Sequence, residues 1–180
     1  MTAAPVPTLV PIEQLNALPP DQLAHALKPL FEAARPLAEA LATRRPFASY
    51  QELLQAARAV SAELDEPDRI EVINAHPRIG ENAAQVRATS ALSYREQGYE
   101  AEAGMSLSET QRLYADLASL NAAYEQKFGF RFVVFVNGRP KAVIAEIMRQ
   151  RFANDRPREM ATALEDMVLI AGDRLRKLTP

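Results

Sequence analysis

The stretch that decides the fold class is Phe128-Gly129-Phe130-Arg131-Phe132-Val133-Val134-Phe135-Val136, a run of aromatic and β-branched residues. Taken alone, such a run is typical of a buried β-strand, because these residue types fit a pleated, half-buried surface. A stable sheet needs several strands, and no second stretch of similar quality occurs in the 180 residues. We therefore expect an all-α protein in which residues 128–136 form a buried extended segment or the start of a helix.

Helical signals occur on both sides of this stretch. Apolar spacing and capping residues predict helices at 12–18, after Asp21, over 50–64, after Pro67, from Ser93, from Ser106, from Pro140 and over 157–177. Residues 81–92 lack a clear period, and we interpret them as a loop or broken turn. The sequence thus predicts a single-domain bundle of about eight helices over residues 11–180. Residues 1–10, rich in Pro and Ala, are expected to form a flexible tail.

The composition argues against several classes of function. With a net charge of -2 and a pI near 5.8, the chain lacks the basic surplus that nucleic-acid binders use against phosphates. The absence of cysteine removes thiolate chemistry and cysteine metal ligands, and two histidines leave little for a metal centre. No stretch approaches the ~18 apolar residues of a membrane span, and no signal-peptide pattern is present. We expect a cytoplasmic protein without a metal.

His76 is the leading candidate for proton transfer, because few side chains of this chain can titrate near neutral pH. It stands between an expected helix end and Pro77, which biases it toward an extended conformation. Gly80 then permits a tight turn. The imidazole is therefore expected at a fixed corner, although a corner histidine that only bonds the backbone is the structural alternative. His25 lies off its apolar stripe and is expected to face solvent.

A second group of polar residues, Ser93, Glu96 and Gln97, has helical spacing and would share one helix face. A capping box, in which Glu96 bonds back to the Ser93 amide, is the structural alternative.

Arg174 follows an apolar stripe of Met160, Leu164, Met167 and Ala171. A cation buried there is costly unless an anion meets it, so Arg174 is a candidate anion clamp. The alternatives are that its stem packs while its head reaches solvent, or that Arg151 has this role. A His, a Glu and an Arg suit proton-transfer chemistry on a small anion.

Five ordered motifs carry a resemblance to a known family. They are His76-Pro77-x-Ile79-Gly80, Ser93-x-x-Glu96-Gln97, Leu120-Asn121-x-x-Tyr124-x-x-Lys127-Phe128-Gly129-Phe130-x-Phe132-Val133, Arg151-Phe152-x-Asn154 and Arg174-Leu175. From about residue 10 to 178 the chain resembles the OHCU decarboxylase family, where OHCU is 2-oxo-4-hydroxy-4-carboxy-5-ureidoimidazoline, an intermediate of urate breakdown. Two features depart from the family pattern: Ile79 replaces the usual Leu, and residues 98–104 are more acidic.

The resemblance implies an all-helical, cofactor-free, commonly dimeric enzyme that converts OHCU to (S)-allantoin and carbon dioxide. It implies His76 and Glu96 as catalytic residues. The substrate-binding residues that it implies are Pro77, Ser93, Gln97, Phe132, Val133, Val134, Phe135, Val136 and Arg174. A functional link to uricase and hydroxyisourate hydrolase would follow. Two alternatives remain open: a non-catalytic helical binding module on the same scaffold, and an enzyme for a related ureido acid.

Overall fold

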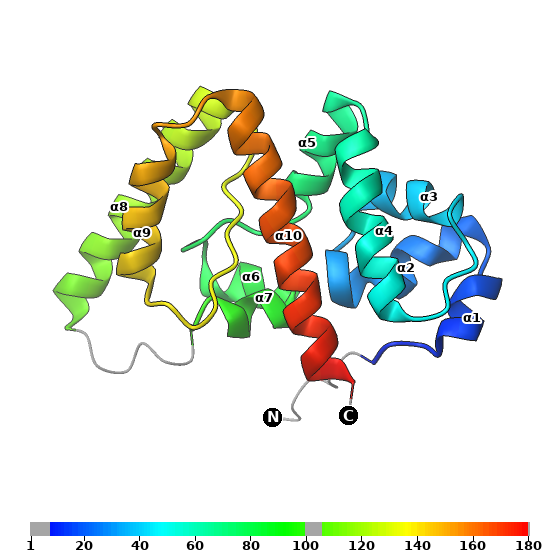
Figure 1. The fold of residues 1–180 in the computed structure, drawn as a ribbon. Coiled ribbons are helices and arrows are strands. Elements are labelled where there is room, and N and C mark those ends of the chain that lie inside the picture. The colour runs from blue at the N-terminus through cyan, green and yellow to red at the C-terminus, as the bar shows by residue number, and fades with distance from the viewer. Residues whose placement is uncertain (1–7, 100–105, 180) are drawn as a thin grey trace. The chain divides into compact units, whose positions relative to one another are not determined.

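The computed structural model describes residues 8–99 and 106–179, and all regular structure in these ranges is helical (Figure 1). The helices are α1 (Ile12–Ala17), α2 (Pro20–Phe31), α3 (Arg35–Ala42), α4 (Tyr50–Glu63), α5 (Glu66–Asn74), α6 (Ala83–Thr89), α7 (Ala91–Glu96), α8 (Leu107–Phe128), α9 (Lys141–Arg151) and α10 (Arg156–Leu178). The all-α prediction is confirmed, with ten described helices in place of about eight. Among the described helices, none is long and apolar enough to cross a membrane. The first seven residues of the expected tail lie outside the described ranges.

The chain divides into two compact units, Met1–Val72 with Val168–Pro180, and Ile73–Met167. In the first unit α2 packs on α3 and α3 packs on α4. Ser49 caps the start of α4, because its side chain accepts a bond from the Glu52 amide at 3.2 Å. Leucines fill the core of this unit, among them Leu23, Leu37 and Leu53, which are fully buried.

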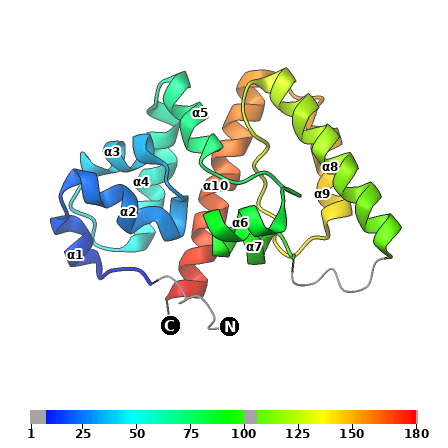
Figure 2. The ribbon, with the colours of Figure 1, turned by 180° about the vertical axis from the view of Figure 1, so that it is seen from behind.

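In the second unit α6 packs on α7 and α8 packs on α9, as the front and back views both show (Figures 1 and 2). A capping box of Ser106 and Glu109 begins α8, and Gly129 ends it in the left-handed conformation at φ 79°. The buried Tyr124 ring contacts four phenylalanines of the same core, Phe128, Phe130, Phe132 and Phe152.

Residues 130–136, drawn in yellow in Figure 1, form a segment without regular structure between α8 and α9 that is buried at all positions except Arg131 and Phe135, which are half-buried. Side chains take the place of a partner strand. Arg151 Nη1 donates to the Val133 carbonyl at 2.9 Å, and Arg139 Nε donates to the Val136 carbonyl at 2.9 Å. The Phe135 N–H is bonded to the Asp166 carboxylate. The expected buried, non-helical segment is confirmed for residues 130–136, whereas Phe128 is the last residue of α8, and these contacts explain how the segment exists in a helical protein.

The interpretation of residues 81–92 as a loop is wrong, because α6 covers Ala83–Thr89 and α7 begins at Ala91. Asn82 caps α6 by accepting bonds from the amides of Ala84 and Gln85. Val86 is the one buried residue of this seven-residue helix, so the sequence carries no apolar period to detect.

Candidate active site

His76 lies two residues after the end of α5, where its N–H donates to the Ile73 carbonyl at 3.2 Å. Pro77 follows and is also buried, and the His76 side chain is only 4% exposed. An imidazole so deeply buried is held in a low-dielectric setting, where interactions with charge are stronger than in water. His25, by contrast, is exposed as predicted.

Gln97 holds the loop that follows His76. Its Nε2 donates to the Arg78 carbonyl at 3.2 Å, and its Oε1 accepts from the Gly80 amide at 3.2 Å. The Tyr99 hydroxyl lies 3.0 Å from the same Oε1 and donates to the Glu81 carbonyl at 2.8 Å. The Gln97 side chain is buried, and these partners fix which way its amide faces.

Helix α8 holds the same loop from another direction. Asn121 Nδ2 donates to the Ile79 carbonyl at 2.9 Å, and Arg78 forms a two-pronged ion pair with Glu125 at 2.5 and 2.9 Å. The bond to Glu125 raises the pKa of the Arg78 guanidinium. The loop after His76 is thus fastened to both α7 and α8.

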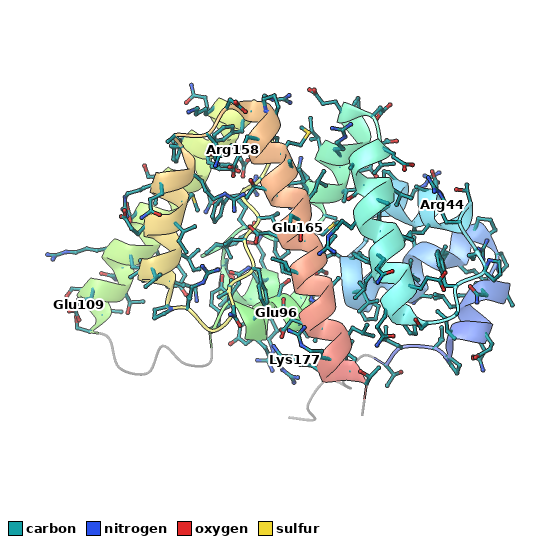
Figure 3. All side chains as sticks on the ribbon, in the orientation of Figure 1. Arg44, Glu96, Glu109, Arg158, Glu165 and Lys177 are labelled. Atoms are coloured by element: carbon teal, nitrogen blue, oxygen red, sulfur yellow. The ribbon has the colours of Figure 1, made fainter. Side chains whose placement is uncertain are left out.

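Helix α7 carries the predicted polar face. Its N-cap is Ser90, whose side chain accepts from the Ser93 amide at 3.1 Å. Ser93 therefore lies inside the helix and is buried, while Glu96, labelled in Figure 3, is the last helical residue and half-buried. The capping-box alternative for Ser93 and Glu96 is wrong, because Ser90 occupies the cap. The role of Glu96 in the site stays a prediction.

Arg151 anchors the extended segment through two carboxylates. Besides the Val133 carbonyl, it contacts Glu159 Oε1 through Nε at 2.6 Å and Asp166 Oδ2 through Nη1 at 2.9 Å. Burial raises the pKa of the Asp166 carboxyl, and Arg151 opposes that shift. The alternative role of Arg151 as an anion clamp for substrate stays a prediction beside these two ion pairs.

The Tyr124 hydroxyl donates to Glu159 within the same buried network. Burial, together with this bond, raises the pKa of Tyr124, so the phenol stays protonated.

Arg174 belongs to the other unit and is 1% exposed. Its Nη2 contacts Glu32 Oε1 at 2.7 Å, and its Nη1 donates to the Leu30 carbonyl at 3.3 Å. The anionic partner expected for a buried arginine is therefore Glu32. A guanidinium carries five N–H donors, so the predicted role in substrate binding stays a prediction beside this ion pair.

Two side chains near Gln97, those of Lys141 and Tyr99, carry no signal in the sequence. Lys141 is buried with its Nζ 2.6 Å from the Gln97 carbonyl and 3.9 Å from the centre of the Tyr99 ring. Lys141 is 44 residues from Gln97 along the chain, and no spacing rule connects the two. Tyr99 falls in the stretch that departs from the family pattern, where only residues up to 99 are described.

Comparison with known proteins decides the family. The OHCU decarboxylase family model matches residues 16–176, which is nearly the whole chain. The chain belongs to the OHCU decarboxylase family. A relative named 2-oxo-4-hydroxy-4-carboxy-5-ureidoimidazoline decarboxylase, from Haloferax volcanii, is 32% identical over 165 residues, covering 91% of this chain and 93% of the relative.

Two further similar proteins differ in the share of their length that this chain covers. The uric acid degradation bifunctional protein of Bacillus sp. (strain TB-90) is 29% identical over 167 residues, and the chain spans only 32% of its length. A crystal structure of OHCU decarboxylase in the presence of (S)-allantoin superposes with a TM-score of 0.60 at 28% identity, covering 79% of this chain and 89% of that one.

Proposed function

We propose that this protein decarboxylates OHCU to (S)-allantoin and carbon dioxide without a cofactor, as a step of urate catabolism. The observation that carries the proposal is the family match over residues 16–176, with His76 and Glu96 intact in their motifs. The burial of His76 at a corner fastened to α7 and α8 supports it, since catalytic groups work best when their surroundings hold them.

The chemistry needs little beyond well-placed donors. Cleavage of the bond to the carboxylate releases carbon dioxide and leaves its electron pair on the ring carbon, where the adjacent carbonyl and imine delocalise it. Donors aimed at the developing oxyanion then supply most of the stabilisation. Backbone amides of Phe132–Val136 are our candidates. Gln97 is another, because its amide group has two N–H bonds and one of them goes to the Arg78 carbonyl.

His76 is the proposed proton donor. After carbon dioxide leaves, the proton is delivered to the neighbouring ring carbon that bears the ureido group, while the hydroxyl on the decarboxylated carbon loses its proton and becomes the carbonyl of the product. Proton delivery from a single face yields one enantiomer, and general acid catalysis of this kind contributes about 10² to 10⁴ in rate. In a second version of this step His76 first removes the proton of the substrate hydroxyl. Glu96 is proposed to orient the substrate or the imidazole, and Pro77 and Ser93 to contact the substrate.

Three finer proposals rest on the family resemblance. Arg174 would bind a substrate oxygen or the ureido group, with Glu32 holding its guanidinium in place. The protein would form a homodimer. It would work in the cytoplasm beside uricase and hydroxyisourate hydrolase.

The test follows OHCU made in situ from urate by uricase and hydroxyisourate hydrolase, with circular dichroism as the readout. We expect rapid appearance of optically active allantoin with the protein, and slow decay to racemic product without it. Slow, racemic decay in both samples would refute the proposed activity.

His76→Asn should abolish this activity while leaving the fold intact, because it removes the proposed proton donor. His25→Asn is the matched control, since His25 is exposed and has no proposed role. Retention of more than about a tenth of the rate by His76→Asn would remove His76 from the mechanism, since general acid catalysis is worth more than that.

A further inference from the structure

Arg131, at the start of the extended segment, binds the backbone on both sides of the His76 corner. Its Nη1 donates to the Asn74 carbonyl at 2.7 Å and to the His76 carbonyl at 3.0 Å. Its own N–H donates to Asn74 Oδ1 at 2.9 Å. The two carbonyls lie at and just beyond the end of α5, where carbonyls lack helical partners and the helix dipole favours a cation.

With the bond from Arg131, both the N–H and the carbonyl of His76 are hydrogen-bonded. The His76 N–H is already bonded to the Ile73 carbonyl, so Arg131 holds the opposite end of the same residue. Pro77 has no N–H and restricts the backbone that precedes it. With both backbone groups bonded, the direction in which the imidazole leaves the chain is set.

The same residue begins the segment proposed to meet the substrate. Phe132 follows Arg131 directly, and the Arg131 amide is itself tied to Asn74. A shift of the His76 corner relative to this segment would therefore strain three hydrogen bonds of one side chain and its backbone. Position 131 is the variable x in the Phe128-Gly129-Phe130-x-Phe132-Val133 motif, so the family resemblance assigns it no role.

We propose that Arg131 is a positioning residue that holds the proton donor His76 in register with the Phe132–Val136 backbone. The inference rests on the proposed function, which gives His76 and the Phe132–Val136 backbone their roles in turnover. The contacts themselves make a prediction about the ring of His76 that needs no substrate.

The first experiment compares imidazole NMR signals in Arg131→Met and Arg156→Met. The control is matched, because Arg156 lies in the same unit and its Nε donates to the Phe128 carbonyl at the end of α8. The chain has only two histidines, so the exposed His25 is an internal reference. We expect the His76 signals to shift or broaden only in Arg131→Met, with His25 unchanged in both variants.

The second experiment measures turnover of OHCU. Arg131→Met should lower kcat by about tenfold to a hundredfold, the effect of misplacing a reacting group by roughly 1 Å, with a smaller change in KM and a partly racemic product. Arg131→Lys keeps the positive charge and one donor toward the carbonyls, so it should recover part of kcat. If Arg131→Met does not fold, kcat of Arg131→Lys is measured in its place.

Native His76 signals and native kcat in Arg131→Met would overturn the inference. Equal losses in Arg131→Met and Arg156→Met would also overturn it, because the effect would then follow general stability. If the unchanged protein does not convert OHCU, the proposed function fails, and the NMR comparison alone decides whether Arg131 fixes the His76 ring.

Discussion

The loop around His76 has no regular structure, yet its main chain is bonded almost residue by residue. The carbonyls of residues 74, 76, 78, 79 and 81 all accept bonds from side chains of Arg131, Gln97, Asn121 and Tyr99. Each donor serves a different part of the loop, so removal of one leaves the others in place. A loop held in this way can present a reacting group with the precision usually given by a helix or strand.

The sequence could single out His76 but not the residues that hold it. Its rarity, its place before Pro77 and the nearby Gly80 are all local features. Arg131 and Asn121 lie 55 and 42 residues from the carbonyls of His76 and Ile79 that they bind, and no local pattern marks such a contact. Gln97 was expected to bind substrate, and its contacts to the loop show a structural role beside that expectation.

Variants of Glu96 and Ser90 distinguish the proposed catalytic role of Glu96 from helix capping on the same short helix. If Glu96 has its proposed role, Glu96→Ala should lower kcat about tenfold or more. The free energy of unfolding should change little, because Ser90 and not Glu96 caps the helix. Ser90→Ala should cost about 1 kcal/mol of stability with near-normal turnover. Urea unfolding and OHCU turnover measure both quantities. A Glu96→Ala protein that is less stable but fully active would return Glu96 to a structural role.

Among the helices, those with side-chain capping signals and long apolar stripes were the ones that the sequence predicted well. The start of α8 at its Ser106 capping box and the end of α5 near Asn74 both match. Helix α6 was missed because its seven residues turn only Val86 inward. The segment after α8 has the composition of a strand, and its environment supplies arginine donors where a sheet would supply amides.

Gly80 controls the approach of the His76 loop to α8. It has φ +74°, and a Cβ added there would lie 2.7 Å from Leu117 Cδ1 and 3.1 Å from Leu117 Cβ. Gly80→Ala should therefore cost about 1–3 kcal/mol through overpacking, and should also lower turnover by moving the loop. Gly98→Ala is the matched control, because Gly98 has φ +71° and a Cβ there would meet nothing within 4 Å.

Thermal or urea unfolding of the two glycine variants gives the comparison directly. Strain from the left-handed backbone is common to both, about 1–2 kcal/mol for a residue with a Cβ. The excess loss in Gly80→Ala measures the contact with Leu117. Equal losses in the two variants would mean that α8 yields to the added methyl group, and that the close approach does not limit the loop.

Across the whole molecule, each of the two units buries an arginine with a carboxylate. Arg174 pairs with Glu32 in one unit, and Arg151 pairs with Glu159 and Asp166 in the other. The sequence marked both arginines by their positions on apolar stripes, but their partners lie on other parts of the chain. Breaking a buried pair leaves an uncompensated charge, so these residues also constrain which substitutions the fold tolerates.

Asp166 gives this fold a pH-dependent stability with a definite sign. Burial raises the pKa of its carboxyl above the unfolded value of about 3.9, even though Arg151 opposes the shift. The folded protein therefore holds this proton more tightly, and the resulting stability is complete below about pH 4 and lost as pH rises through the folded pKa. Asp166→Asn removes this titration. The free energy of unfolding of the unchanged protein, relative to that of the variant, should therefore decrease as the pH rises from acid to neutral. Urea unfolding at a series of pH values measures this difference, and a rise with pH would mean that attraction to Arg151 outweighs the cost of burial.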